Sequence, residues 1–223
     1  MNIVKVEKVT QIFPEGAEKV HALDQVSCQV AEGDFVALCG PSGSGKTTLL
    51  NLMGCLMRPD QGMVEICGRD VSRLSQNALT EFRLRQIGFV FQDYNLIPTF
   101  SALENIEYVL WLQKIPAAER HRRISEIAKR FGIDHLLHRR PDQLSRGQQQ
   151  RVAVARAIVH HPRLVLGDEL TANLDHKTGA ELMDFLRELN RTEKIAFVYA
   201  THDPAMMEKA ARVIRLKDGV LEP

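Results

Sequence analysis

The chain has 223 residues, of which 44 % are hydrophobic, so it is long enough for one large domain with a sizeable buried core. Its 29 Lys and Arg residues are matched by 28 Asp and Glu residues, and the net charge of +1 argues against nucleic-acid binding driven by bulk charge. The start of the chain lacks the pattern of a secretion signal, and no apolar run approaches the roughly 20 residues of a membrane helix. We therefore expect a cytosolic protein that meets a membrane only through a partner chain.

The first third of the chain predicts strands around one helix. Apolar residues at period two indicate half-buried strands at residues 4–6 and 26–30. The continuous apolar run "DFVALCG" (34–40) is typical of a buried strand, and "KTTLLNLMGCLM" (46–57) of a helix. The segment "GMVEICGRDV" (62–71) predicts a strand, a turn and a second strand. The four cysteines show no CxxC spacing, so we expect reduced thiols rather than a metal site.

The remaining two thirds alternate between helices and buried strands. Residues 72–137 are richer in Arg and Glu and predict a helical insertion that contains a loop at "FQDYNLIPT". Buried strands are predicted at "RLVLGDE" (163–169) and "KIAFVYATHD" (194–203), with a helix at residues 178–190 between them and a closing hairpin around Asp218-Gly219. The predicted fold is α/β, with a mainly parallel sheet, an N-terminal antiparallel β part and an inserted helical lobe.

The segment "GPSGSGKT" matches the phosphate-loop pattern G-x-x-x-x-G-K-[ST] between a predicted strand and a predicted helix. Its backbone N–H groups and the helix N-terminus would bind phosphate oxygens, Lys46 would neutralise the β- and γ-phosphates, and Thr47 would ligate Mg²⁺. A chance glycine-rich turn is the weaker alternative, because the flanking elements fit the motif. The predicted nucleotide-binding residues of this segment are Gly40, Pro41, Ser42, Gly43, Ser44, Gly45, Lys46, Thr47 and Thr48.

Two acidic residues end the buried strand "RLVLGDE". Asp168 can hold Mg²⁺ directly or through water, and Glu169 can act as the general base on an attacking water. A surface turn is the alternative, and it is weaker in a chain that already carries a phosphate loop. This P-loop NTPase pattern predicts ATP and Mg²⁺ as ligands, but it leaves open what the ATP is used for.

Five motifs follow one another along the chain: "GPSGSGKT", "FVFQDYNLIP", "LSRGQQQRVAVARA", "RLVLGDELTANLD" and "YATHD". In this order they resemble the ATP-binding subunit of an ABC transporter, and within that family the bacterial group of macrolide exporters, lipoprotein-release systems and the cell-division ATPase. The resemblance implies a single nucleotide-binding domain over residues 1–223. It places the helical lobe, with its Q-loop and signature, within about residues 72–160.

The resemblance also implies roles for individual residues. Gln92 matches the Q-loop glutamine, which reaches Mg²⁺ and the attacking water, and His202 matches the switch histidine at the γ-phosphate, so that both join Glu169 as catalytic residues. Asp175 falls in the D-loop at the dimer seam, and Phe13 matches an aromatic ring that stacks on adenine. Gln92 could instead be an ordinary loop amide, and His202 a surface histidine. For Phe13, a core position is an equally strong alternative.

The signature residues Ser145, Arg146, Gly147 and Gln148 would complete the site of a second copy. The S-x-x-Q spacing predicts a capping box that places Arg146 at the first helical position. The family has glycine at 146, and here the guanidinium could either attract the γ-phosphate of the opposite copy or hold the dimer open. Leu170 stands where the family has proline, and we expect a modest change in how rigidly Glu169 is held.

The function implied is that of an Mg²⁺-dependent ATPase, a head-to-tail homodimer on two ATP molecules that drives a separately encoded permease at the inner face of the membrane. An ATP-dependent regulator or scaffold with slow or no hydrolysis is the alternative. An ABC protein acting on DNA or ribosomes is disfavoured, and no nucleic-acid partner is expected. We also expect Tyr108, Leu110 and Trp111 to form core or packing surface of the helical lobe, and residues 119–123 ("ERHRR") to form a solvated helix face.

Overall fold

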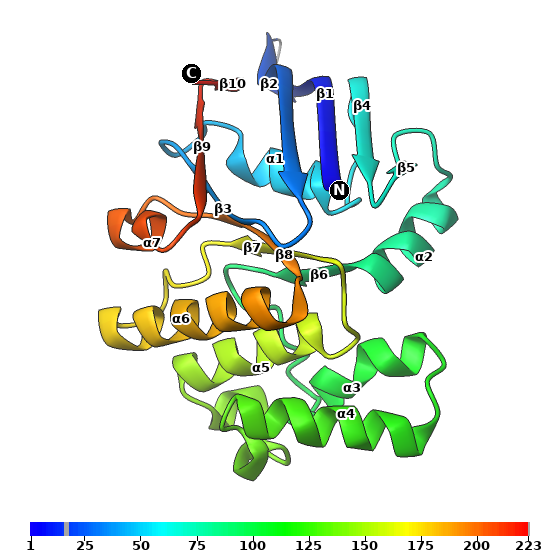
Figure 1. Ribbon diagram of the computed structural model, residues 1–223, viewed down its shortest axis with the longest axis vertical. Helices are drawn as coiled ribbons and strands as arrows, with labels where there is room; N and C mark the ends of the chain where they lie inside the picture. Colours follow the sequence, from blue (N-terminus) through cyan, green and yellow to red (C-terminus); the bar gives the residue numbers. More distant parts are fainter. Residues whose placement is uncertain (16–17, 223) are drawn as a thin grey trace.

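The computed structural model describes residues 1–15 and 18–222, which form two β-sheets with helices between and below them (Figure 1). The smaller sheet is antiparallel, with strand order β2-β1-β4-β5. Its strands are β1 (Asn2–Glu15), β2 (Glu18–Ala31), β4 (Gln61–Ile66) and β5 (Arg69–Asp70). This is the antiparallel part predicted near the N-terminus.

The larger sheet has the order β10-β9-β3-β8-β7-β6, and its pairs are parallel except for the terminal hairpin of β9 and β10. The hairpin turns at Asp218 and Gly219, both with positive φ, as predicted. The strands of the larger sheet are β3 (Phe35–Cys39), β6 (Ile87–Val90), β7 (Leu164–Asp168), β8 (Ala196–Ala200), β9 (Arg212–Lys217) and β10 (Val220–Leu221).

The central strands divide their side chains between two hydrophobic cores. On β3, Val36 and Leu38 face the antiparallel sheet and the helix α1 (Lys46–Met53), whereas Phe35 and Ala37 face the helices on the other side. This follows from the period of two in a strand. Figure 1 shows α1 between the two sheets, with α5 (Arg146–Ile158) and α6 (His176–Glu193) below the larger one.

The helical lobe consists of α3 (Ala102–Leu112) and α4 (Ala117–Arg130), which pack with α5 at the end of the molecule farthest from the antiparallel sheet (Figure 1). The remaining helical segments are α2 (Gln76–Gln86), η1 (Asp134–Leu136), η2 (Pro141–Gln143) and α7 (Pro204–Glu208). Within the described residues, each helix is too short or too polar to cross a lipid bilayer.

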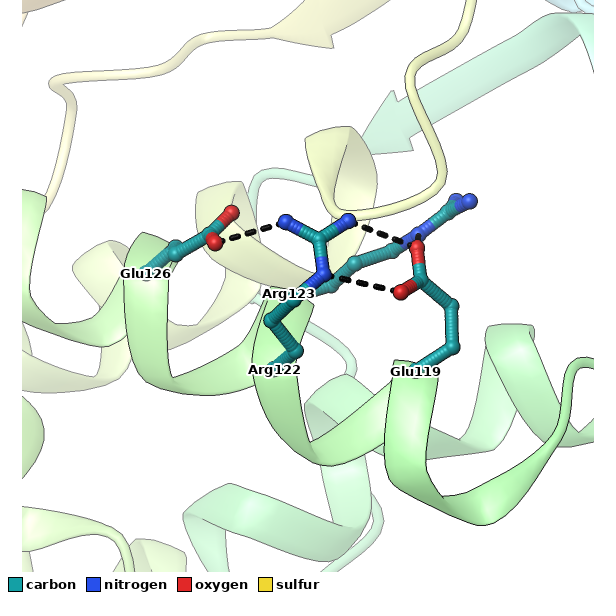
Figure 2. Close-up of polar contacts among 4 residues, drawn as sticks. All are labelled: Glu119, Arg122, Arg123 and Glu126. Atoms are coloured by element: carbon teal, nitrogen blue, oxygen red, sulfur yellow. Dashed lines mark hydrogen bonds and ion pairs between the residues drawn. The ribbon is translucent and has the colours of Figure 1, made fainter.

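The polar side of α4 is a network of ion pairs within the helix, as Figure 2 shows. The Arg122 guanidinium donates to both Glu119 and Glu126, and Arg123 Nε donates to Glu119 at 2.7 Å. The hydrogen bonds from the two arginines lower the pKa of Glu119 to about 2. These side chains neutralise one another, so residues 119–123 form the predicted helix face rather than a binding site.

The helical character predicted for residues 72–137 is wrong for β6. Ile87–Val90 forms the edge strand of the larger sheet and pairs with β7, and α2 before it packs into the core of the antiparallel sheet through Leu79 and Phe82. A four-residue apolar run has too few residues to reveal a period, so the strand is hidden between two helical patterns. The lobe proper therefore follows β6.

We expect the buried histidine that follows α5, His160, to make the stability of the fold depend on pH. Burial lowers the pKa of His160 from 6.5 to about 4, and its two ring nitrogens lack hydrogen-bond partners among the described residues. The folded pKa lies below the unfolded one, so the stabilisation is complete above pH 6.5 and is lost as the pH falls toward 4. Over that window we expect His160 to account for a loss of about 3 kcal/mol in the free energy of unfolding.

The check is urea unfolding at several pH values between 4 and 7. The His160→Gln variant should show a shallower loss of stability with falling pH than the original chain. The matched variant His121→Gln changes an exposed histidine of α4 and should keep the original slope. Equal slopes in all three proteins would contradict this account.

Candidate functional site

The phosphate loop joins the buried strand β3 to α1, and two of its glycines are required by close contacts. Gly40 has φ 154° and Gly45 has φ 101°. A Cβ atom on Gly40 would lie 1.9 Å from the carbonyl oxygen of Leu216, and one on Gly45 would lie 2.3 Å from that of Ala22. Only glycine fits these positions, and the loop is thereby folded tightly against β9 and β2.

Lys46 is the first residue of α1, and its side chain folds back over the loop. The residue is only 9 % exposed, and Nζ donates to the carbonyl oxygens of Gly40 at 2.9 Å and Pro41 at 2.7 Å. The buried hydroxyl of Ser44 has no hydrogen-bond partner within the described part of the chain. A held ammonium group beside an unsatisfied hydroxyl at a helix N-terminus is a site suited to an anion.

Thr47 and Asp168 bring two oxygen atoms together from distant parts of the chain. The Thr47 hydroxyl donates to Asp168 Oδ2 at 3.0 Å. Burial raises the pKa of Asp168, the hydrogen bond from Thr47 lowers it, and the charge of Glu169 raises it further. A cation at this point would favour the charged carboxylate.

These two residues suit Mg²⁺ bound together with phosphate. The described residues hold no cluster of three or more His, Cys, Asp or Glu side chains placed to bind a metal ion. Mg²⁺ commonly takes one or two protein ligands and completes its shell with phosphate oxygens and water. The pair Thr47 and Asp168 therefore fits a metal ion that enters with its nucleotide.

Glu169 directly follows β7, and both its backbone and its side chain are held by contacts with the segment at the end of β8. Its backbone N–H donates to the carbonyl oxygen of Ala200 at 3.1 Å, and its Oε1 lies 3.0 Å from Nδ1 of His202. Its φ of 49° is in the left-handed region, which is unfavourable for a residue with a side chain. The surrounding contacts must therefore hold this conformation.

A cleft of about 610 Å³ collects most of the predicted site residues of one chain. Gln92 is one of the lining residues, and its backbone carbonyl accepts a hydrogen bond from Asn173 Nδ2 at 3.1 Å. The lining residues come from segments that are distant in sequence. These are β2, the phosphate loop with α1, the loop after β6, the end of β7 and the segment after β8. The cleft is lined by Ala22, Ser42, Gly43, Gly45, Lys46, Thr47, Thr48, Gln92, Asp168, Glu169 and His202.

The signature residues lie elsewhere, in a separate cavity of about 470 Å³. Ser145 Oγ accepts from the Gln148 N–H at 3.3 Å, and Gln148 Oε1 accepts from the Ser145 N–H at 2.9 Å, so the predicted capping box is confirmed. Arg146 is the first residue of α5, and its side chain is exposed. Gly147 and Asp175, the N-cap of α6, line the same cavity. One chain therefore does not bring its signature and its phosphate loop together.

Phe13 lies outside both cavities. It is 40 % exposed on β1, where it pairs with Val20 of β2. Its role toward adenine stays a prediction. On α3, Leu110 is core as predicted, whereas Tyr108 and Trp111 are 41 % and 59 % exposed.

Two polar side chains of α5, the half-buried Arg156 and the buried Gln150, make contacts that the sequence does not predict. Arg156 donates to the carbonyl oxygens of Asn95 at 2.6 Å and Tyr94 at 2.7 Å, and so holds the loop that follows Gln92. Gln150 donates to the carbonyl oxygen of Leu170 at 2.8 Å. Gln150 directly precedes the apolar stretch "RVAVARAIV" (151–159) and Arg156 lies within it, but the partners of both residues are 20 or more residues away in sequence.

Comparisons with known proteins find similar sequences and a similar fold. A family model described as ABC transporter matches residues 23–172. An uncharacterised ABC transporter ATP-binding protein of Thermotoga maritima is 46 % identical over 220 residues, which are 99 % of this chain and 94 % of that protein. The macrolide export ATP-binding/permease protein MacB of Syntrophobacter fumaroxidans is 40 % identical over the whole chain, which spans 32 % of MacB.

A solved structure is also similar. It is the ATP-binding cassette MJ0796 of Methanocaldococcus jannaschii, described as a dimeric post-hydrolysis state bound to ADP and Pi. The TM-score is 0.93 at 42 % sequence identity, over 99 % of this chain and 97 % of that one.

Proposed function

The chain belongs to the ABC transporter family as an ATPase cassette, and from this we propose that two copies close head to tail on two Mg-ATP molecules and drive a separate membrane permease of the exporter group. One observation carries the proposal. The cleft holds the phosphate loop and the acidic residues, while the signature occupies a different cavity of the same chain. A site with both halves therefore requires a second copy.

The residues of the cleft suit hydrolysis of the γ-phosphate. Lys46 would neutralise the phosphates, and Thr47 and Asp168, whose side-chain oxygens lie 3.0 Å apart at the cleft, would hold Mg²⁺. When bound, Mg²⁺ supplies positive charge to the β- and γ-phosphate oxygens. Glu169 takes a proton from the attacking water, whose oxygen bonds to the γ-phosphorus while the bond to the bridging oxygen breaks and its electron pair leaves with ADP. His202 holds the Glu169 carboxylate in place, and Gln92 orients the water.

The partner that we propose is an integral-membrane permease docked on the helical lobe. Tyr108 and Trp111 are exposed and stacked on α3 with ring centroids 6.2 Å apart, and Phe100 packs edge-on against Tyr108. Phe100 and Gln92 belong to the same loop, so a partner bound to these rings would be coupled to the cleft through that loop. The likeness to MacB supports the exporter group. This partner would hold the chain at the inner face of the membrane.

The effect of Arg146 on ATP turnover distinguishes a transport ATPase from a regulator that hydrolyses ATP slowly. Arg146 lies at the N-terminus of α5, where the helix dipole disfavours a positive charge, so it does not stabilise its own helix. We expect it to attract the γ-phosphate bound by the opposite copy. Replacing it by glycine should cost about 1 kcal/mol, seen as a roughly fivefold fall in kcat/KM for ATP.

The measurement is steady-state ATP turnover of the purified chain together with single-turnover hydrolysis. Arg146→Lys keeps the charge and should retain most of the activity. Faster turnover in Arg146→Gly would identify the arginine as a brake. Slow hydrolysis in the original chain, with ATP held for long periods, would favour the ATP-dependent regulator or scaffold over the transport ATPase.

A further inference from the structure

The segment that carries Glu169 is held by contacts of the residue that follows it, Leu170. Leu170 follows Glu169, is only 5 % exposed, and packs into the core formed by α5 and α6. Because Glu169 itself has a left-handed backbone conformation, the residue after it must be fixed if the carboxylate is to keep its direction.

Gly167 makes room for the Leu170 side chain. A Cβ atom at position 167 would lie 2.5 Å from Cδ2, 2.6 Å from Cγ and 2.8 Å from Cδ1 of Leu170. Gly167 belongs to β7 and pairs with Val90 on one side and Tyr199 on the other, so the backbone cannot move away. Its φ is outside the left-handed region, and the three atoms nearest to such a Cβ all belong to Leu170, so the need for glycine comes from the Leu170 side chain rather than from the backbone conformation.

Gln150 holds the same segment through a hydrogen bond from its side chain to the backbone of Leu170. Its side chain is buried, and Nε2 donates to the Leu170 carbonyl oxygen at 2.8 Å. Gln150 lies on α5, whose first residues are the signature. A single helix therefore connects the cavity that would meet the opposite copy's ATP to the chain beside Glu169.

We propose that Gly167, Leu170 and Gln150 are positioning residues that set the direction of the Glu169 carboxylate, with glycine at 167 as the condition for leucine at 170. The inference rests on the proposed role of Glu169 as the general base. Gly167 and Leu170 form a matched pair in this proposal. A methyl group at 167 would displace the Leu170 side chain and so turn Glu169, and a smaller residue at 170 would remove this steric clash.

The test is a double-mutant cycle on steady-state ATP turnover with Gly167→Ala, Leu170→Ala and the two combined. Gly167→Ala should lower kcat at least about tenfold, with KM for ATP within about twofold, because a small misplacement of a catalytic group is costly in rate. Leu170→Ala keeps the backbone bond from Gln150 and should lower kcat less than Gly167→Ala does, and the combined variant should be faster than Gly167→Ala and within about threefold of Leu170→Ala alone. A combined variant no faster than Gly167→Ala, or a Gly167→Ala enzyme with full kcat, would overturn the pairing.

Gln150→Met provides an independent measurement that leaves β7 unaltered. It removes the donor to Leu170 and should lower kcat about tenfold with KM little changed. The matched variant Gln113→Met removes a similar amide-to-carbonyl bond, from Gln113 Nε2 to the Leu84 oxygen at 2.7 Å, far from the cleft, and should keep full kcat. Full kcat in Gln150→Met would remove Gln150 from the set. Full turnover in Glu169→Gln would instead refute the proposed function, so the two failures are distinguishable.

Discussion

Replacing Glu169 by glutamine should lower kcat for ATP hydrolysis about 10²- to 10⁴-fold while ATP binding stays intact. Glutamine keeps the size of the side chain and its contact with His202, but it cannot accept the proton of the attacking water. The phosphate loop, Thr47 and Asp168 are unaltered, so the affinity for the nucleotide should change little. The measurement is phosphate release at saturating Mg-ATP, with ATP binding followed by calorimetry.

The matched control is Glu188→Gln, which changes an exposed glutamate of α6 away from the cleft. It should turn over ATP at the original rate. Phosphate release by Glu169→Gln within a few-fold of the original chain would remove Glu169 as the general base.

Replacing Lys46 by methionine should act one step earlier, on nucleotide binding. The carbonyl oxygens of Gly40 and Pro41 hold the ammonium group within the phosphate loop, next to the place where we expect the phosphates to bind. Methionine keeps an apolar stem and removes the charge. Hydrogen bonds to charged groups contribute about 1.5–3 kcal/mol each, so we expect ATP affinity to fall roughly 10- to 100-fold.

Calorimetry with Mg-ATP measures this loss. Lys129→Met, at an exposed position of α4, removes a charge outside the cleft and should bind ATP as before. An unchanged affinity in Lys46→Met would show that the phosphates are bound elsewhere.

The parts of the site that could be predicted from the sequence are those whose chemistry is local. The phosphate loop needs a strand, a tight turn and a helix within about 20 residues, and all three leave a pattern in the sequence. The capping box of Ser145 and Gln148 spans four residues and is confirmed by its two hydrogen bonds. The pairing of Asp168 with Thr47 was anticipated only as shared binding of Mg²⁺.

The parts that could not be predicted depend on contacts between distant segments. The sequence predicts only a modest effect of Leu170, through the backbone freedom that leucine restores relative to proline. The structure places its side chain against the Cα of Gly167, in a space that any other residue at 167 would fill. Likewise β6 is too short to show a period, and only its pairing with β7 identifies it as a strand.

The central claim is that a complete ATP site forms between two copies, and sedimentation of Glu169→Gln tests it most directly. This variant should bind ATP without consuming it, and so trap the closed state. Sedimentation should give the mass of one chain without nucleotide and the mass of two chains with Mg-ATP. A single-chain mass in saturating Mg-ATP, with binding verified by calorimetry, would contradict the central claim.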